Sequence, residues 1–394
     1  MNRITRYVVT EILKTFGMSL TAMTSFIVLI FLVQEALREK MTLTAVLRLI
    51  PYLLPTALCF AIPATMLFAV CVIYGRMSAN NEIVTIKSSG ISPSVVMVPG
   101  LVVAFLLSLV TVFLNDVSVS WGRRGIYKVV LESSSQTIYT MLRAQGQFAK
   151  GQIFINVDDV DGDVLVHPFI VRTNEKGEDT FSIRALSARI LVDVPNEQLI
   201  LSLKNAQISQ GKSFESHLDQ KDIPIELSDV TKRNDTSSRP WNLPLREMQP
   251  ATLLHSQHLK SLRQAMATRL VSQQIGGDMV GLTHPEWGAE LYELREAKFD
   301  GYRLAAEPWR RWANGFSCLS FVVLGIPLSV LFKRFDFWTN FAFCFIPILV
   351  LYYPLLMYGI GQAKAGGLPP YSVWLGNIVL LIIGGTLVHR VNRN

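Results

Sequence analysis

Long uncharged runs alternate with polar stretches along the chain. The six runs cover residues 16–33, 50–74, 95–114, 312–332, 337–363 and 371–389. Each has the length that a helix needs to cross a bilayer, roughly 18 residues or more for about 30 Å of hydrocarbon. The pattern predicts a polytopic membrane protein with six transmembrane helices.

A long polar segment, residues 115–309, separates the third run from the fourth. In its first part apolar residues occupy alternate positions, which is typical of strands with one apolar face. Three such sets are Ile153, Ile155 and Val157, then Ile190, Val192 and Val194, then Leu199, Leu201 and Leu203. The turn Pro195-Asn196-Glu197 predicts that the last two sets form a hairpin. The pattern predicts an antiparallel sandwich or an open, jelly-roll-like sheet with an apolar inner face. We place this β-jellyroll-like domain within residues 143–250.

Helical spacing replaces this alternation from residue 252 onward. Residues 255–274 and 285–307 are expected to form two helices, with Gly276 and Gly277 at the break between them. The second helix is placed so that it can continue into the fourth transmembrane run. The helical stretch 252–309 thus completes the inserted segment.

The predicted fold is a membrane α-helical protein with an inserted antiparallel β domain. Residues 1–114 hold the first three transmembrane helices and a polar loop at 75–94, and residues 310–394 hold the last three. Residues 115–309 form the soluble domain between them.

Basic residues near the ends of the runs predict the orientation. With both termini in the cytoplasm, the short inner segments carry nine Lys and Arg residues and the short outer segments carry four. Four more arginines, at the outer ends of the third and fourth runs, weaken this contrast: Arg123, Arg124, Arg310 and Arg311. Because cytoplasmic loops carry an excess of Lys and Arg, the large domain is predicted on the outside, which is the periplasm in a bacterium.

Composition agrees with a membrane protein. Half of the residues (50%) are hydrophobic and only 17% are charged, and the mean hydropathy is +0.33. The net charge of +7 does not come from one basic patch, because many basic residues flank apolar runs. All four cysteines lie in apolar runs, which excludes a disulfide framework and a Cys/His zinc pattern.

Motifs for chemistry are sparse. Gly211-Lys212-Ser213 resembles the end of a phosphate-binding loop but lacks the upstream glycine, and His255 and His258 have metal-ligand spacing without an obvious third ligand. No run has an Asp, Glu, Lys or Arg near its middle, where ion-coupled transporters keep such groups. We therefore expect a non-catalytic subunit without cofactor or metal, for which another subunit supplies the energy.

The loop at 75–94 has helical character. Gly75 and Gly90 bound its polar part, Ser78 or Asn80 is a candidate helix cap, and Glu82 lies early in the expected helix. A solvated connector would look similar. The length and helical character favour docking onto a partner.

Several motifs resemble the lipopolysaccharide export permease family. They are the stretch from Arg6 to Lys14, Gly75-Arg76-Met77-Ser78, Glu82-Ile83, Ser89-Gly90-Ile91-Ser92, Gln145-Gly146-Gln147-Phe148, Ile326-Pro327-Leu328-Ser329, and Trp374 with Asn377. The resemblance covers both membrane halves. The first span and the motif ending at Phe148 are closer to the F-type of the two homologous subunits. The stretch 252–301 is longer than the usual connection of the family.

The resemblance implies a function and its partners. A permease of this family lies in the bacterial inner membrane and extracts lipopolysaccharide, together with a homologous second permease subunit, a cytoplasmic ABC ATPase dimer and a periplasmic bridge protein. It also implies site residues. The candidates are Arg76, Glu82 and Gly90 for ATPase coupling, Gln34 and Arg38 for lipid binding, and Phe148, Ile153 and Ile155 for the lipid path in the β domain. Glu35 departs from the family pattern, which often has lysine at this position. Arg38 has an alternative role as a residue whose charged end extends to the membrane interface.

Two other function classes stay open at this point. A membrane-bound enzyme acting on envelope lipids would need an acid/base pair or a nucleophile near a bundle mouth, and the sequence offers no convincing one. A structural or sensory module would use the β domain to bind a partner.

Overall fold

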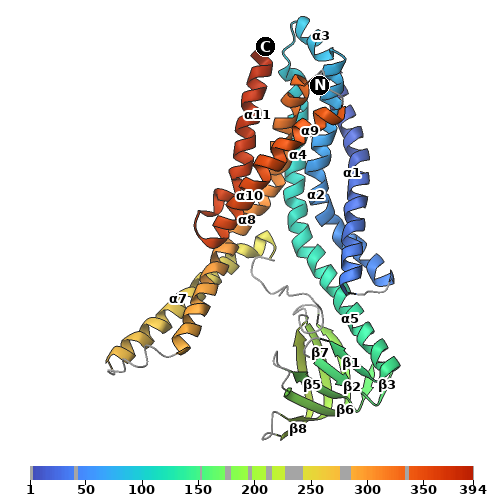
Figure 1. Cartoon of the computed structure of the whole chain (residues 1–394), viewed down its shortest axis with the longest axis vertical. Helices are drawn as coiled ribbons and strands as arrows, with labels where there is room; N and C mark the ends of the chain where they lie inside the picture. The colour runs from blue at the N-terminus through green and yellow to red at the C-terminus, as the bar shows by residue number, and fades with distance from the viewer. Residues whose placement is uncertain are drawn as a thin grey trace. The chain divides into compact units, whose positions relative to one another are not determined.

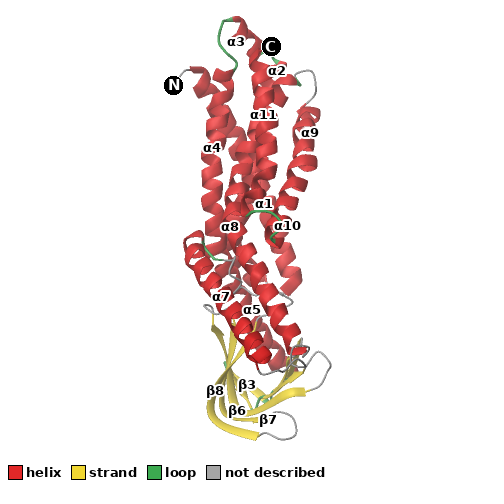
Figure 2. Cartoon of the chain, turned by 90° about the vertical axis from the view of Figure 1, so that its left-hand side faces the viewer, coloured by secondary structure: helices red, strands yellow, loops and turns green. Residues whose placement is uncertain are grey.

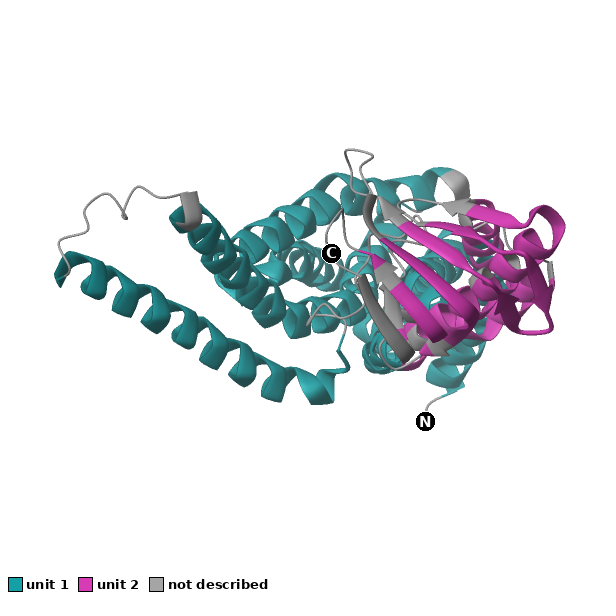
Figure 3. Ribbon diagram, turned by 90° about the horizontal axis from the view of Figure 1, so that it is seen from below, with its two compact units in different colours: residues 1–27, 55–120, 240–394 teal, residues 28–54, 121–239 magenta. Residues whose placement is uncertain are grey.

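The computed structural model describes residues 3–39, 43–150, 153–173, 179–193, 198–209, 215–226, 243–275, 285–332 and 337–393. The chain divides into two compact units. Unit 1 comprises residues 1–27, 55–120 and 240–394, and unit 2 comprises residues 28–54 and 121–239 (Figure 3). The β-sheet belongs to unit 2, and most of the long apolar helices belong to unit 1.

Six helical segments of the described chain are long and apolar enough to cross a membrane, as predicted. They are built from α1 (Arg3–Glu39), α2 (Leu43–Ala79), α4 (Ser94–Val117), α8 (Pro285–Leu331), α9 (Phe337–Pro347) with π-helix η4 (Ile348–Tyr352) and α10 (Tyr353–Ala365), and the 3-10 turn η5 (Pro370–Trp374) with α11 (Leu375–Arg393) (Figure 1). Pro347 lies where α9 passes into the π-helix, since proline cannot donate to a regular helical ladder. The fifth apolar run is therefore an interrupted helix.

Small and polar side chains let α8 pack closely on its neighbours. A Cβ at Gly315 would lie 3.0 Å from the backbone nitrogen of Val112 on α4. Asn377 of α11 is fully buried, and its side-chain amide donates to the Ala313 carbonyl at 2.8 Å. Such contacts matter in a bilayer because helices gain little from the hydrophobic effect there and rely on close packing and hydrogen bonds.

The third apolar run does not end its helix where the charges begin. The π-helix η1 (Ser118–Arg123) connects α4 directly to α5 (Arg124–Gln145). The apolar run reports only which part of the helix is suited to lipid. Within α5, buried residues recur at helical spacing, which gives it an apolar face within unit 2: Ile126, Tyr127, Val130, Leu131, Ile138 and Leu142.

In the part of the chain that the structure describes, the β domain forms one antiparallel sheet of eight strands. The strands are β1 (Gln147–Lys150), β2 (Ile153–Asn156), β3 (Asp159–Asp161), β4 (Val164–Val166), β5 (Phe169–Thr173), β6 (Asp179–Asp193), β7 (Gln198–Ser209) and β8 (Glu215–Glu226). Their order is β1-β2-β5-β6-β4-β3, and β7 pairs with both β6 and β8. Figure 2 shows the strands as a curved sheet. The antiparallel sheet is confirmed, and the jelly-roll arrangement stays a prediction.

The register of the sheet agrees with the predicted hairpin. Asp193 at the end of β6 pairs with Gln198 at the start of β7, as a tight connection requires. The turn residues 195–197 lie outside the described residues. Strand β8 extends the sheet past residue 210, where the many polar residues hide any alternation of apolar positions. The strand is held there by backbone pairing along β7, which does not depend on apolar side chains.

A helical hairpin precedes the fourth membrane span. Helix α7 (Leu245–Ile275) lies beside the first half of α8 (Figure 1). The His255 ring donates its Nε2 proton to the Ala297 carbonyl at 2.7 Å, and Arg269 pairs with Glu290. The break expected at Gly276 and Gly277 lies outside the described residues. Helix α8 does continue into the span, and its 47 residues measure about 70 Å, far more than a bilayer needs.

Candidate functional site

The loop between α2 and α4 contains the short helix α3 (Glu82–Ser88). Its helix cap is Asn81, with a left-handed φ of 58° and no side-chain capping bond. Ser78 and Asn80 are therefore not the caps: the Ser78 hydroxyl donates to the Val330 carbonyl at 2.8 Å, and the Asn80 amide donates to the Glu82 carboxylate at 3.3 Å. Gly90 has a φ of 79°, which glycine adopts without strain.

One side of α3 packs against the other helices of unit 1, and the other side is exposed. Ile83 is buried in the helical core, whereas Val84 and Ile91 are exposed and Glu82 is half-buried. Figures 1 and 2 show α3 at the same end of unit 1 as the C-terminal end of α11. An exposed surface of apolar residues around one carboxylate is suited to a protein partner.

The base of this loop is fastened to three other helices of unit 1. The Arg76 guanidinium pairs with the Glu11 carboxylate on α1 at 3.1 Å. The Tyr74 hydroxyl donates to the Val96 carbonyl at the start of α4 at 2.8 Å, and Ser78 reaches α8 as described above. A displacement of α3 would therefore be transmitted to α1, α4 and α8 through these contacts. Glu11, which sequence reasoning did not single out, is the partner of the predicted residue Arg76.

The predicted lipid-binding residues lie near the C-terminal end of α1. Gln34 is exposed, and Glu35 beside it is half-buried. Arg38 belongs to the last turn of α1, but its side chain lies outside the described residues. The structure thus places Gln34 and the backbone of Arg38 on one helix, one turn apart.

The predicted residues of the β-domain path lie on adjacent strands. Phe148 of β1 pairs directly with Ile155 of β2, and their side chains are 5% and 1% exposed within the core of unit 2. Ile153 pairs with Lys150 and Arg172 through the backbone, but its side chain lies outside the described residues. Phe148 and Ile155 therefore face the apolar side of the sheet.

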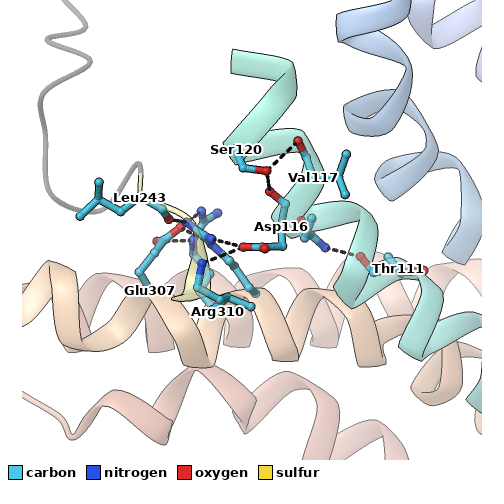
Figure 4. A network of polar contacts seen from close by, with 10 residues as sticks. Thr111, Asp116, Val117, Ser120, Leu243, Glu307 and Arg310 are labelled. Atoms are coloured by element: carbon cyan, nitrogen blue, oxygen red, sulfur yellow. Dashed lines mark hydrogen bonds and ion pairs between the residues drawn. The ribbon is translucent and has the colours of Figure 1, made fainter. Parts of the chain in front are cut away.

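A network of charged groups in unit 1 was not predicted. Arg311 of α8 is 1% exposed, and its guanidinium contacts the Asp116 carboxylate of α4 at 3.2 Å, the Glu307 carboxylate at 3.4 Å and the Leu243 carbonyl at 2.7 Å (Figure 4). Arg310 donates to Glu307 at 2.8 and 2.5 Å. Sequence reasoning treated the two arginines only as membrane-flanking charges. The spacing of Glu307 to Arg310 and Arg311 could have revealed the local pairs, since residues three and four apart share a helix face.

Comparison with protein families gives an independent result. The sequence matches the family described as lipopolysaccharide export system permease LptF/LptG over residues 6–390. The chain belongs to the LptF/LptG family. The match spans nearly the whole chain and includes every motif on which the resemblance rested. No curated protein matches the chain.

LptF/LptG membership makes the chain a permease component of lipopolysaccharide export. The two histidines of the remaining motifs can be placed in the structure. His255 is engaged with α8 and His258 is exposed, and no group of three or more potential metal ligands occurs among the described residues. Gly211-Lys212-Ser213 lies outside the described residues.

Proposed function

We propose that this LptF/LptG chain is one of two permease subunits of an ABC-type exporter. It extracts lipopolysaccharide from the inner membrane and passes it to a periplasmic bridge protein, powered by a cytoplasmic ATPase dimer. The observation that carries the proposal is the exposed helix α3 on a base fastened to three membrane helices. The lack of charged residues near the middle of the apolar runs supports an external energy source.

The contacts at the base of α3 define a route for force. When the ATPase moves α3, α2 shifts with it because the two helices are joined by only two residues, Asn80 and Asn81. Arg76 then pulls α1 along through its ion pair with Glu11. In the proposal, Arg76 acts within the chain, Glu82 contacts the ATPase, and Gly90 lets the loop turn back into α4.

Purification of the chain from its native membrane tests this function. Co-isolation of an ATPase subunit and of a second permease supports the exporter. Turnover of an envelope lipid by the isolated chain would indicate a membrane enzyme instead, and neither result would indicate a structural or sensory module. Each outcome excludes the other two.

The proposed orientation predicts which side of the membrane each loop faces. Single cysteines at Asn156 and Asn234 should react with an impermeant thiol reagent added from outside, whereas one at Ser88 should not. Asn156 and Ser88 are both exposed, so a difference reports the side of the membrane and not burial, while Asn234 lies outside the described residues. The native cysteines are replaced first. Labelling of Ser88 in intact cells would overturn the orientation.

Arg38 is proposed to contact the acidic head group of the lipid. A guanidinium binds phosphate through two parallel hydrogen bonds that lysine cannot copy. Arg38→Ala should therefore reduce lipid-stimulated ATP hydrolysis by the complex more than Arg48→Ala does, and Arg38→Lys should restore it only in part. Arg48, exposed near the start of α2, is the matched control. Equal effects of the two alanine variants would favour a snorkelling role for Arg38.

A further inference from the structure

The charged network lies beside both chain connections of the β-sheet. The segment that contains the sheet leaves unit 1 after residue 120 and returns at residue 240, and residues 28–54 of unit 2 form a separate excursion. Asp116 lies just before the first crossing and Leu243 just after the second, and Arg311 contacts both. Residues 127 positions apart in the sequence are thus held by one side chain of α8.

The returning connection has a second contact with Asp116. The backbone N–H of Leu245, the first residue of α7, donates to the Asp116 carboxylate at 2.7 Å. The first N–H groups of a helix have no partner within the helix, and a carboxylate satisfies them best because it also complements the positive helix end. Asp116 therefore caps α7 from another segment of the chain.

The network is satisfied, as a buried charge requires. Arg311 finds two carboxylates and one carbonyl, and Glu307 is shared between Arg310 and Arg311. Burying a guanidinium without such partners is costly, so loss of one member leaves the others uncompensated. The planar fork of arginine holds five N–H donors in a fixed arrangement, whereas the lysine ammonium has only three on a compact charge.

The position along the helices also matters. Trp309 and Tyr371 are exposed, with ring centroids 6.4 Å apart, and such exposed aromatic residues are typical of a membrane–water interface. Two residues after Asp116, the helix becomes the π-helix η1, an irregularity at which helices bend.

We propose that Asp116 and Arg311 form an anchor that fastens the end of α4 and the start of α7 to α8, so that the outgoing and the returning connections of the inserted segment move together with α8. They are positioning residues and not lipid ligands. The transport consequence rests on the proposed function, but the anchor itself does not.

Spin-label distance measurements on the purified full chain in lipid nanodiscs test the anchor without ATPase or substrate. Labels are attached at Phe113→Cys on α4 and Gln249→Cys on α7, both exposed, with the four native cysteines replaced. The unmodified anchor should give one narrow distance distribution. Arg311→Ala should broaden it, and the milder Arg311→Gln and Asp116→Asn should broaden it as well, which keeps the test valid if the alanine variant does not fold.

Arg310→Ala is the matched control, because Arg310 lies on the same helix turn and its two hydrogen bonds in the network both go to Glu307. It should leave the distribution narrow. An unchanged distribution in Arg311→Gln and Asp116→Asn, or equal broadening in Arg310→Ala, would overturn the proposal.

In the assembled exporter, the ratio of lipid released to ATP hydrolysed should fall about fivefold or more in Arg311→Gln. Broadened distances in a chain that neither binds an ATPase nor releases lipid would retain the anchor and reject the proposed function. Narrow distances together with a normal ratio would reject the anchor alone.

Discussion

Glu82→Lys is expected to separate the permease from its ATPase and to abolish ATP-driven lipid release. Glu82 lies in the first turn of α3, half-buried, with exposed apolar residues beside it. In the proposed complex this carboxylate meets a basic residue of the ATPase in a desolvated contact. Removing one member of such a pair costs about 2 to 5 kcal/mol, which weakens binding by about 30-fold or more. Charge reversal adds repulsion.

The measurements are co-purification of the ATPase and lipid release with ATP. Glu82→Gln should give a smaller loss, because the amide keeps its hydrogen bonds but not its charge. Glu293→Lys makes the same charge change on the exposed part of α8 and should leave both readings unchanged. If Glu82→Lys retained both at the unmodified level, the coupling role of this loop would have to be withdrawn.

Gly384→Ala is expected to destabilise the helical unit, whereas the same change at the adjacent Gly385 is not. A Cβ at Gly384 would lie 2.7 Å from the backbone oxygen and 2.8 Å from the carbonyl carbon of Val323 on α8. Backbone atoms cannot turn aside as a side chain does, so α11 and α8 must separate. Overpacking of this kind typically costs about 1 to 3 kcal/mol.

Gly385 is a matched control on the same helix. Among the described residues, nothing lies within 4 Å of a Cβ at this position. Gly385→Ala should therefore keep or slightly raise stability, since alanine limits the freedom of the unfolded chain. Thermal unfolding in detergent, followed by loss of the monodisperse protein, measures the difference. Equal midpoints for the two variants would contradict the close approach of α8 and α11.

Sequence patterns alone determined the main elements of this protein. Uncharged runs identified the six apolar helices, because partitioning into lipid depends on local composition. Alternation identified strand segments such as the one with Ile190 and Val192, because a sheet with one apolar face has a period of two. The motifs of both membrane halves indicated the family, which the match over residues 6–390 confirms.

Local patterns also have a definite limit. They missed that α4 continues through η1 into α5, since hydropathy reports the membrane part of a helix and not its end. They missed strand β8, which pairs through backbone hydrogen bonds that polar residues make equally well.

Only the tertiary structure decided which charged residues meet. Arg76 was predicted as a coupling residue, but its partner Glu11 lies 65 positions away on another helix. Arg311 and Asp116 are 195 positions apart, and each alone looks like an ordinary charge at the end of a membrane span. Their pairing depends on how α4, α7 and α8 pack together, which no local pattern encodes. Burial makes the loss of either partner much more destabilising than at an exposed position, because an unpaired charge is costly only where water is excluded.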